Sequence, residues 1–285
     1  MEHFSSEDAC RDYLIKLLWA GKPKCPHCKC QRVYTITNRP AYSCSKCKKQ
    51  FRVTTGTIFE DSKIPLVKWF IAIRFLACSK KGMSSMQLSK ELGITQKSAW
   101  YMEQNIRLML GNRRYVKMLD GIIEVDETYV GGRRKGGKRG RGTEKAKIFG
   151  MLERNGDLRI MHVADVSSYT LHPLIIGNVK VGAVIMSDEW KAYNGLKGRY
   201  QRGVINHGKR HYADGEIHVN SLEGAWGLFK RSLKGIYHRP SNKYMFGYCA
   251  EFEFKYNNRK KSIPLIFSTA IRQSKIRATH SQITY

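Results

Sequence analysis

Long apolar segments are absent from this sequence of 285 residues. The most apolar stretch, Trp69 to Ala77, is interrupted by Arg74 and is far too short to span a bilayer. No run near the N-terminus has the basic-then-apolar order of a signal peptide. These absences exclude a membrane-spanning class and lead us to expect an intracellular, cytoplasmic protein.

Acidic residues are scarce as well. Only 23 Asp and Glu oppose 51 Lys and Arg, which gives a net charge of +28 and a sequence pI near 9.9. An excess of this size favours a polyanionic partner, because cations that neutralise phosphates release counterions and bind in a salt-dependent way. A ribosome-associated or merely soluble basic protein has a similar composition, so charge alone does not specify the partner.

The cysteines show a specific spacing. In a reducing compartment the eight cysteines of the chain are not expected to form disulfides. Four of them follow the pattern C-x2-C-x15-C-x2-C, formed by Cys25, Cys28, Cys44 and Cys47. Paired knuckles of this spacing present four thiolates to one tetrahedral Zn2+, and β-forming residues lie between them. We therefore expect a zinc ribbon that the metal holds folded, with Cys30 outside the symmetric knuckle pair.

Two short helical segments are predicted in the middle of the chain, over residues 84–92 and 96–102. A turn that contains Gly93 separates them, and Thr95 can cap the second. This layout fits a helix-turn-helix, whose second helix can enter a major groove. The residues that would then face the bases or the backbone are Gln96, Lys97 and Ser98. A three-helix bundle without DNA contacts has the same layout and remains an alternative.

From residue 121 onwards the pattern changes to alternating strands. We expect strands over 122–130, 147–152, 158–164 and 183–186, with a helix over 170–177. Three consecutive strands, a crossover helix and a further strand suggest a mixed sheet with helices packed on it. Asp126 is expected within the first strand and Asp188 just after the fourth.

The segment from Asn220 to Leu233 is predicted to form an amphipathic helix. Its apolar stripe consists of Leu222, Trp226, Phe229 and Leu233. A second stripe carries Glu223 and Lys230, with Asn220 one turn earlier. One edge of this helix thus presents an amide, a carboxylate and an ammonium group together.

These polar residues suit phosphodiester chemistry. Mg2+ prefers hard oxygen ligands, so carboxylates from separate elements, here Asp126, Asp188 and Glu223, can hold Mg2+ beside nucleic acid. Lys230 can contact phosphate as a point charge. Each acid alone is weak evidence, because an Asp near a strand end is more often a turn or cap residue. Together, in a strongly basic chain, they indicate metal-dependent cutting and joining of DNA.

A glycine-rich basic loop over residues 133–142 joins the first two expected strands and contains no acid. Flexible cationic segments suit a phosphate backbone and can become ordered on contact, although a solvated loop without a partner is the alternative. The candidate DNA contacts in this loop are Arg133, Arg134, Lys135, Lys138, Arg139 and Arg141.

Several motifs carry a resemblance to a known family. They are the stretch from Glu124 to Gly132, Ser187-Asp188-Glu189-Trp190 with Ala192-Tyr193, Ile205-Asn206-His207, and the stretch from Ile217 to Gly224. These motifs resemble those of bacterial insertion-sequence transposases with a zinc ribbon, to which Merlin-type transposases are more distantly related. The resemblance extends from the ribbon to Tyr256-Asn257-Asn258-Arg259, which is nearly the whole chain.

The resemblance implies a ribonuclease H-like fold and a DDE-type site that uses Mg2+ or Mn2+. By position, Asp126 and Asp188 match the first two catalytic acids, and Lys230 matches the lysine after the third. The third position is Glu, Asn or His in this family, so both Glu223 and Asn220 are candidates. We favour Glu223, because a carboxylate is the better Mg2+ ligand and it lies two turns before Lys230.

The sequence thus predicts a multidomain α/β protein with structural Zn2+. We expect an N-terminal helix and zinc ribbon over 1–56, a helix-turn-helix region over 57–116, and a ribonuclease H-like catalytic domain with a C-terminal tail over 117–285. The expected protein is a DNA transposase that cleaves and transfers strands at terminal inverted repeats. Its partner is double-stranded DNA, both transposon ends and target, and it acts as a homo-oligomer at the nucleoid of a bacterial host. A zinc-dependent DNA-binding regulator with a non-catalytic third domain and a nuclease without strand transfer are the alternatives.

Overall fold

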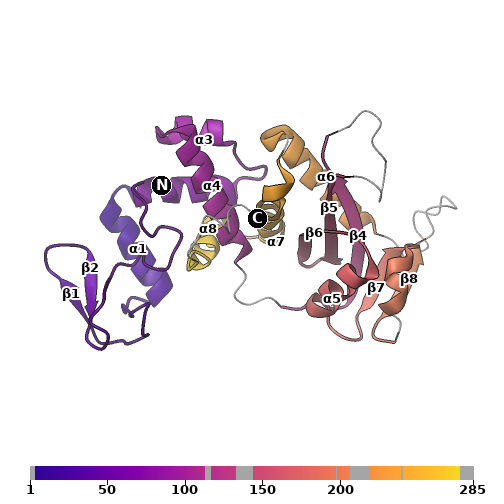
Figure 1. Ribbon diagram of the computed structural model, residues 1–285, viewed down its shortest axis with the longest axis horizontal. Coiled ribbons are helices and arrows are strands. Elements are labelled where there is room, and N and C mark those ends of the chain that lie inside the picture. The colour runs from indigo at the N-terminus through magenta and orange to yellow at the C-terminus, as the bar shows by residue number, and fades with distance from the viewer. Residues whose placement is uncertain are drawn as a thin grey trace. The chain divides into compact units, whose positions relative to one another are not determined.

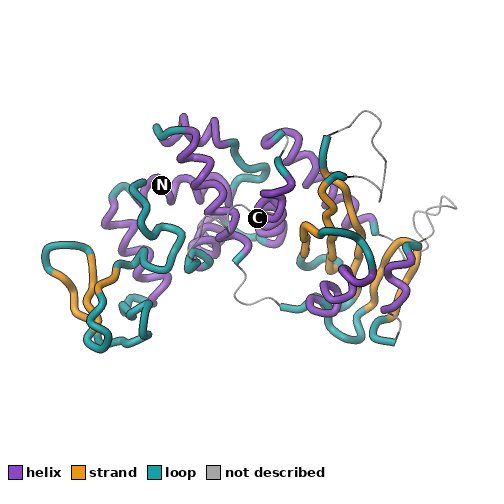
Figure 2. Tube along the Cα trace, viewed as in Figure 1, coloured by secondary structure: helices purple, strands orange, loops and turns teal. Residues whose placement is uncertain are grey.

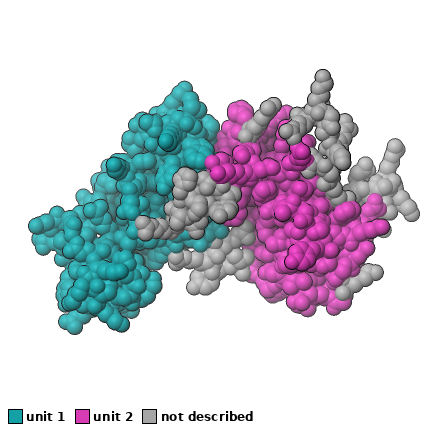
Figure 3. Space-filling model, in the orientation of Figure 1, with its two compact units in different colours: residues 1–114, 261–284 teal, residues 115–260, 285 magenta. Residues whose placement is uncertain are grey.

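The computed structural model describes residues 4–112, 117–132, 144–196, 198–205, 219–238 and 240–276 (Figures 1 and 2). The chain divides into two compact units (Figure 3). Unit 1 comprises residues 1–114 and 261–284, and unit 2 comprises residues 115–260 and 285. Among the described residues, no helix has the length and apolarity needed to cross a membrane.

Unit 1 begins with a helix and a small sheet. Helix α1 (Glu7–Trp19) is capped by Ser6, whose side chain accepts a hydrogen bond from the backbone N–H of Ala9. The strands β1 (Val33–Ile36), β2 (Ala41–Cys44) and β3 (Gln50–Phe51) form an antiparallel sheet in that order. This small sheet has the strand arrangement that the cysteine spacing predicted for a ribbon.

Four further helices complete unit 1: α2 (Leu66–Cys78), α3 (Ser85–Leu92), α4 (Gln96–Gly111) and α8 (Ile263–Arg272). Gly93 ends α3 with a φ of 56°, a left-handed conformation that glycine adopts without steric penalty. The side chains of Ser84 and Thr95 cap α3 and α4. The predicted helix, turn and helix are therefore present.

Helix α8 packs in unit 1, although the sequence grouped residues 261–285 with the sheet. The ring of Phe267 contacts the rings of Phe4, Tyr13 and Phe70, which come from the start of the chain, α1 and α2. The backbone also crosses between the two segments of the unit, because the Ile58 N–H donates to the Ser274 carbonyl at 3.1 Å. Unit 1 is therefore built from both ends of the described chain.

Unit 2 is built on a five-stranded mixed sheet with the order β6-β5-β4-β7-β8. The strands are β4 (Ile122–Val130), β5 (Ala146–Glu153), β6 (Leu158–Val163), β7 (Val184–Asp188) and β8 (Gln201–Ile205). The strands β4, β5 and β6 pair antiparallel, whereas β7 pairs parallel with β4 and β8 pairs parallel with β7. The sequence predicted a mixed sheet but not β8, and Asp188 is the last residue of β7 instead of following it.

Helices cover both faces of this sheet (Figure 1). On one face, α5 (Ser168–Asn178) and a 3-10 helix (Lys191–Leu196) pack on apolar residues of β4 and β5 that include Val125 and Phe149. On the other face lie α6 (Asn220–Ser232), the π-helical turn Leu233–Tyr237, the 3-10 turn Asn242–Tyr244 and α7 (Met245–Asn257). Side chains alternate along a strand, so successive residues of β4 enter different layers of the core.

Candidate functional site

The four predicted zinc ligands form a compact cluster. The sulfur atoms of Cys25, Cys28, Cys44 and Cys47 all lie within 4.8 Å of one another. The Cys25 and Cys47 sulfurs are 3.6 Å apart, and those of Cys28 and Cys44 are 3.4 Å apart. Four converging thiols are the donor set of a structural Zn2+ site. The residues present therefore fit the metal that the spacing predicted.

The two knuckles repeat one backbone turn. The N–H of Lys29 donates to the Cys25 carbonyl and that of Lys48 to the Cys44 carbonyl, each at 3.0 Å. Cys30 is not one of the four clustered cysteines, and its sulfur lies 3.7 Å from the Ser45 hydroxyl. The prediction that Cys30 stands outside the metal site agrees with this geometry.

In unit 2, Asp126 and Asp188 lie on neighbouring parallel strands. Glu124 of β4 pairs with Met186 of β7, and each predicted acid lies two residues further along its strand. Because side chains alternate, Asp126 shares a face with Glu124, and Asp188 shares a face with Met186. Met186 packs against Val219, the residue before α6, so both acids belong to the face that α6 covers.

A tryptophan of α6 contacts the first acid directly. The indole Nε1–H of Trp226 donates to Oδ2 of Asp126 at 3.0 Å. The ring packs on β5 at Gly150, where an added Cβ would come within 2.5 Å of two ring carbons. Gly150 pairs with Asp126 across the strands, so the absence of a side chain there allows the indole to reach the carboxylate.

The surroundings of Asp126 disfavour its charged form. Burial raises the pKa of this carboxyl to about 7, and the charges of Glu127 and Asp188 add to the rise. The hydrogen bond from Trp226 opposes it. A partly buried carboxylate beside other acids is stabilised by a cation, so Asp126 and Asp188 fit a divalent metal that prefers oxygen ligands.

Another buried acid fixes the start of α6. Glu124 is fully buried, and its Oε2 accepts the N–H of Leu222 at 2.9 Å. Its Oε1 accepts from Nε of Arg154, also at 2.9 Å. No side chain of α6 itself caps this helix. Glu124 therefore satisfies one of the first N–H groups of the helix and holds its N-terminal turn against β4.

The remaining predicted site residues lie along the solvent-facing edge of α6. Asn220, Glu223 and Lys230 are all exposed. Across the described part of the chain, only the cysteine cluster brings three or more His, Cys, Asp or Glu ligand atoms within 4.8 Å of one another. The structure thus brings Asp126 and Asp188 together, and it does not gather Glu223 with them into such a group.

The predicted DNA contacts of the second short helix are partly engaged within unit 1. The Gln96 amide donates to the Ser85 hydroxyl at 2.8 Å, and the Ser98 N–H donates to the Thr95 hydroxyl at 3.2 Å. Lys97 is exposed at the helix start. The basic-loop candidates, Arg133, Arg134, Lys135, Lys138, Arg139 and Arg141, lie outside the described residues.

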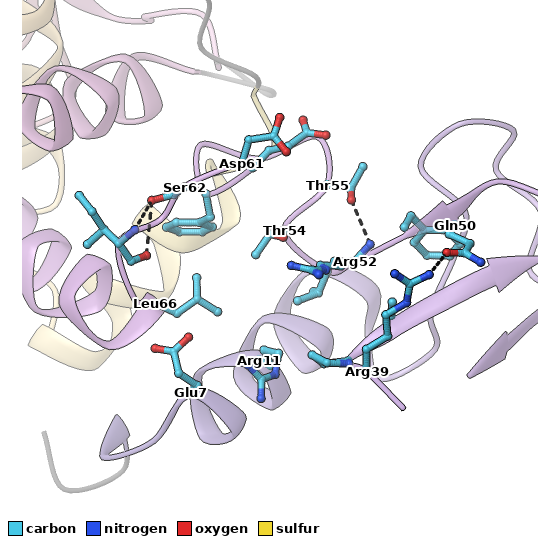
Figure 4. A pocket seen from close by; sticks show the side chains of 17 residues that line it. Glu7, Arg11, Arg39, Gln50, Arg52, Thr54, Thr55, Asp61, Ser62 and Leu66 are labelled. Atoms are coloured by element: carbon cyan, nitrogen blue, oxygen red, sulfur yellow. Dashed lines mark hydrogen bonds between the residues drawn. The ribbon is translucent and has the colours of Figure 1, made fainter. Parts of the chain in front are cut away.

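A polar cavity of about 460 Å³ opens in unit 1 between α1, the ribbon and the segment before α2. Figure 4 shows Arg11, Arg39 and Arg52 around it, and Glu60 and Asp61 are among its acidic lining residues. Some of these acids already serve the fold, since Oε2 of Glu60 accepts the Gly56 N–H at 3.1 Å. Balanced charge gives no preference for an anion or a cation, and we assign no ligand to this cavity.

Two family models match this chain. An ISXO2-like transposase domain matches residues 118–257, which span the whole sheet and α6. A transposase zinc-ribbon domain matches residues 5–50. This chain belongs to the transposases with an ISXO2-like domain and a zinc ribbon. The predicted resemblance to insertion-sequence transposases with a zinc ribbon is thereby confirmed, as is the predicted fold class of ribbon, helices and mixed sheet.

Individual relatives of this transposase are also found. It is 26% identical over 294 residues to a protein in transposable element ISH50 of Halobacterium salinarum, covering 94% of this chain and 98% of that protein. It is 29% identical over 97 residues to a transposase-like protein of Haemophilus influenzae, covering 34% of this chain and 77% of that protein. The crystal structure of the Mos1 strand transfer complex matches 72% of this chain and 74% of its own, with 10% identity and a TM-score of 0.31.

Sequence reasoning missed the groups that hold the acids in the transposase domain. Trp226 was interpreted as part of an apolar stripe, and its indole N–H also serves Asp126. Glu124 received no role, although it lies two residues before Asp126 and strand alternation places both on one face. Arg202 gave no signal, because its contacts depend on β8 pairing with β7.

Proposed function

We propose that this protein is a DDE-type DNA transposase that binds the terminal inverted repeats of its element and carries out metal-dependent cleavage and strand transfer. The observation that carries this proposal is the position of Asp126 and Asp188 on adjacent parallel strands beneath α6, each two residues beyond the paired Glu124 and Met186, inside the region that matches a transposase domain. Two carboxylates from separate elements supply the oxygen ligands that phosphodiester chemistry requires.

Asp126 and Asp188 are the residues proposed to hold Mg2+ or Mn2+. Such a metal supplies activation of the attacking oxygen and charge stabilisation at the phosphate. Trp226 orients the Asp126 carboxylate through its N–H, and the same ring excludes water from that side of the carboxylate. The protein thus contributes a preformed and partly dry carboxylate pair.

The third position is assigned to α6. Because Glu124 fixes the first turn of α6, Glu223 is held one residue after the anchored N–H of Leu222. We propose Glu223 as the third acid that would help to hold the metal, and Lys230 as a phosphate contact two turns later. Asn220, on the same edge of the helix, is the competing candidate.

Unit 1 is proposed to recognise DNA. Its helix, turn and helix place the exposed Lys97 at the start of α4, and the four cysteines of its ribbon would hold a structural Zn2+. The net charge of +28 supports a nucleic-acid partner, because Lys and Arg bind the phosphate backbone. Binding of two transposon ends together implies a homo-oligomer, and the basic loop over 133–142 is proposed to contact DNA.

The proposal is tested by changing the two acids separately. We expect Asp126→Asn and Asp188→Asn to abolish Mg2+-dependent cleavage of a duplex that carries the element's terminal sequence, and to retain binding of that duplex. The matched control is Asp157→Asn, a half-exposed acid in the β5–β6 turn, which should cleave like the wild type.

The outcomes separate the competing functions. Full cleavage by either Asn variant refutes the site. Sequence-specific binding with no cleavage by the wild-type protein indicates a DNA-binding regulator. Cleavage without any joined product in a strand-transfer assay indicates a nuclease. To decide the third position, Glu223→Gln is compared with Asn220→Ala, and we expect the larger loss of cleavage for Glu223→Gln.

A further inference from the structure

Asp188 occupies a position that needs support. It is the last residue of β7, and the chain turns immediately afterwards into the 3-10 helix that starts at Lys191. Its Oδ1 accepts the backbone N–H of Trp190 at 3.0 Å, so the orientation of the carboxylate follows the shape of this turn. A group that fixes the turn therefore fixes the carboxylate.

Arg202 of β8 binds this turn through all of its guanidinium nitrogens. Its Nε donates to the Ser187 hydroxyl at 2.9 Å, and Nη2 donates to the Asp188 carbonyl at 2.8 Å. Nη1 donates to Oδ1 of Asn194 at 2.6 Å, and Nη2 also approaches the Trp190 carbonyl at 3.5 Å. One side chain thus holds the residues immediately before and after the turn.

The guanidinium itself is held by its surroundings. It lies over the ring of Tyr193, 5.7 Å from the ring centre, and Tyr193 is fully buried. The hydroxyl of Tyr193 donates to Oε2 of Glu127 at 2.7 Å, and Glu127 follows Asp126 in β4. The contacts therefore run from the strand that carries Asp126 to the turn that carries Asp188.

This assembly lies on the opposite face of the sheet from α6. Ser187 precedes Asp188 and is completely buried, and Tyr193 belongs to the core on the α5 face. Because successive side chains point to opposite faces, Arg202 holds Asp188 from behind. It acts through the backbone of the turn, and we assign it no contact with DNA.

We propose that Arg202 is a positioning residue that keeps the Asp188 carboxylate beside Asp126 in the geometry required for a divalent cation. This inference rests on the proposed function, in which the two acids hold that cation. Groups that orient metal ligands typically change metal affinity or activity by about 10- to 100-fold when they are altered.

The chemistry of arginine explains why lysine cannot replace it here. A guanidinium presents several donors in a rigid plane, which allows one side chain to bind Ser187, Asp188 and Asn194 together. A lysine ammonium keeps the charge but cannot reproduce these directions at once. Arg202→Lys therefore separates the positioning role from the effect of net charge.

The experiment compares Arg202→Lys and Arg202→Met with the wild type in the full-length, zinc-loaded protein. Mn2+ binding is measured by electron paramagnetic resonance of the free ion, and terminal-repeat DNA binding by fluorescence anisotropy. We expect Mn2+ affinity to fall about tenfold or more in Arg202→Lys and further in Arg202→Met, with DNA affinity unchanged. Cleavage should show a lower kcat at an unchanged KM for DNA.

The control is Arg199→Met, which removes an exposed positive charge three residues away. Equal loss of Mn2+ affinity in Arg199→Met and Arg202→Met would assign the effect to net charge and overturn the proposal. Wild-type Mn2+ affinity and kcat in Arg202→Lys would overturn it as well. If Arg202→Met does not fold, the Mn2+ affinity and kcat of Arg202→Lys decide the question. A loss of Mn2+ affinity that is explained entirely by a lower melting temperature of the variant would count against a positioning role.

Failure of the underlying function gives a different result. A wild-type protein that neither binds Mn2+ in unit 2 nor cleaves DNA refutes the proposed function. A wild type that does both, together with an unaffected Arg202→Lys, refutes only the role of Arg202.

Discussion

Asp126 shows how strongly the fold alters a single residue. An aspartate carboxyl in water is charged at neutral pH, whereas burial and two neighbouring acids raise the pKa of Asp126 to about 7. In the metal-free protein a proton therefore occupies this carboxyl over part of the physiological range. Binding of a divalent metal must displace that proton, so metal affinity should rise with pH.

The same shift predicts how the metal-free protein responds to pH. The folded state binds the Asp126 proton more tightly than the unfolded state, so the stabilisation is complete in acid and is lost as pH rises towards about 7. Asp126→Asn keeps the shape of the side chain but does not titrate, so it removes this pH-dependent loss of stability. We expect the variant to exceed the wild type in free energy of unfolding by a few kcal/mol near pH 8, at about 1.4 kcal/mol per pKa unit.

Equilibrium urea unfolding from acid to alkaline pH, in buffer without Mg2+ or Mn2+, measures this difference. The control Asp157→Asn changes a half-exposed acid and leaves Asp126 in place, so it should keep the loss of stability that Asp126 causes as pH rises. A stability difference between Asp126→Asn and the wild type that stays constant between about pH 5 and 8 would contradict the raised pKa.

At the scale of elements, local periodicity was a good guide. The alternation in β4 and the four-three-four apolar spacing in α6 predicted both elements and placed Asp126 and Glu223 on them. The edge strand β8 escaped prediction, because Gly203 and polar residues interrupt its pattern. Neighbouring strands and parallel pairing are long-range properties, and no local pattern contains them.

The contact between α6 and β5 provides a second test. An Ala side chain at Gly150 would lie 2.5 Å from the ring of Trp226 and 3.2 Å from Leu222. The ring must then move, so we expect Gly150→Ala to lose about 1–3 kcal/mol of stability and to weaken the Trp226 contact with Asp126. Urea unfolding and the near-ultraviolet circular dichroism of the tryptophans report the two effects.

Gly177→Ala is the matched control for this substitution. Gly177 lies in α5, and an added Cβ there meets no atom within 4 Å. Since alanine favours helix over glycine, this control should leave stability unchanged or raise it by up to about 1 kcal/mol. Equal stability of the two alanine variants would show that Trp226 is not packed on β5 as described.

At the scale of the whole molecule, unit 1 differs from the expected order of domains because it combines residues 1–114 with residues 261–284. The apolar pattern of α8 predicts an amphipathic helix, but a pattern of this kind does not identify the surface that the helix covers. Phe267 reaches three aromatic rings from the N-terminal part of the chain. The partner of a helix is a tertiary property, so the sequence pattern alone left these residues as a C-terminal tail of the preceding domain.

Phe267→Ala tests this arrangement. Removing a buried phenylalanine costs about 3–5 kcal/mol, so we expect the melting transition of unit 1 to fall while that of unit 2 is retained. Differential scanning calorimetry with and without Mn2+ identifies the unit 2 transition by its response to metal. Leu265→Ala on the same helix is the control, because Leu265 is 50% exposed and should have little effect. A shift of the metal-responsive transition instead would place α8 with the sheet.

The return of the chain to unit 1 also sets the order in which a ribosome can complete the molecule. Residues 115–260 leave the exit tunnel before α8 does, so the sheet with its paired aspartates can form while the ribbon and its neighbouring helices still lack their closing segment. A nascent chain therefore acquires the unit that we propose acts on phosphodiesters before it completes the unit that we propose recognises the element. Any prematurely terminated product that ends before Ile263 would contain the sheet with Asp126 and Asp188 but would lack α8, and therefore a complete unit 1.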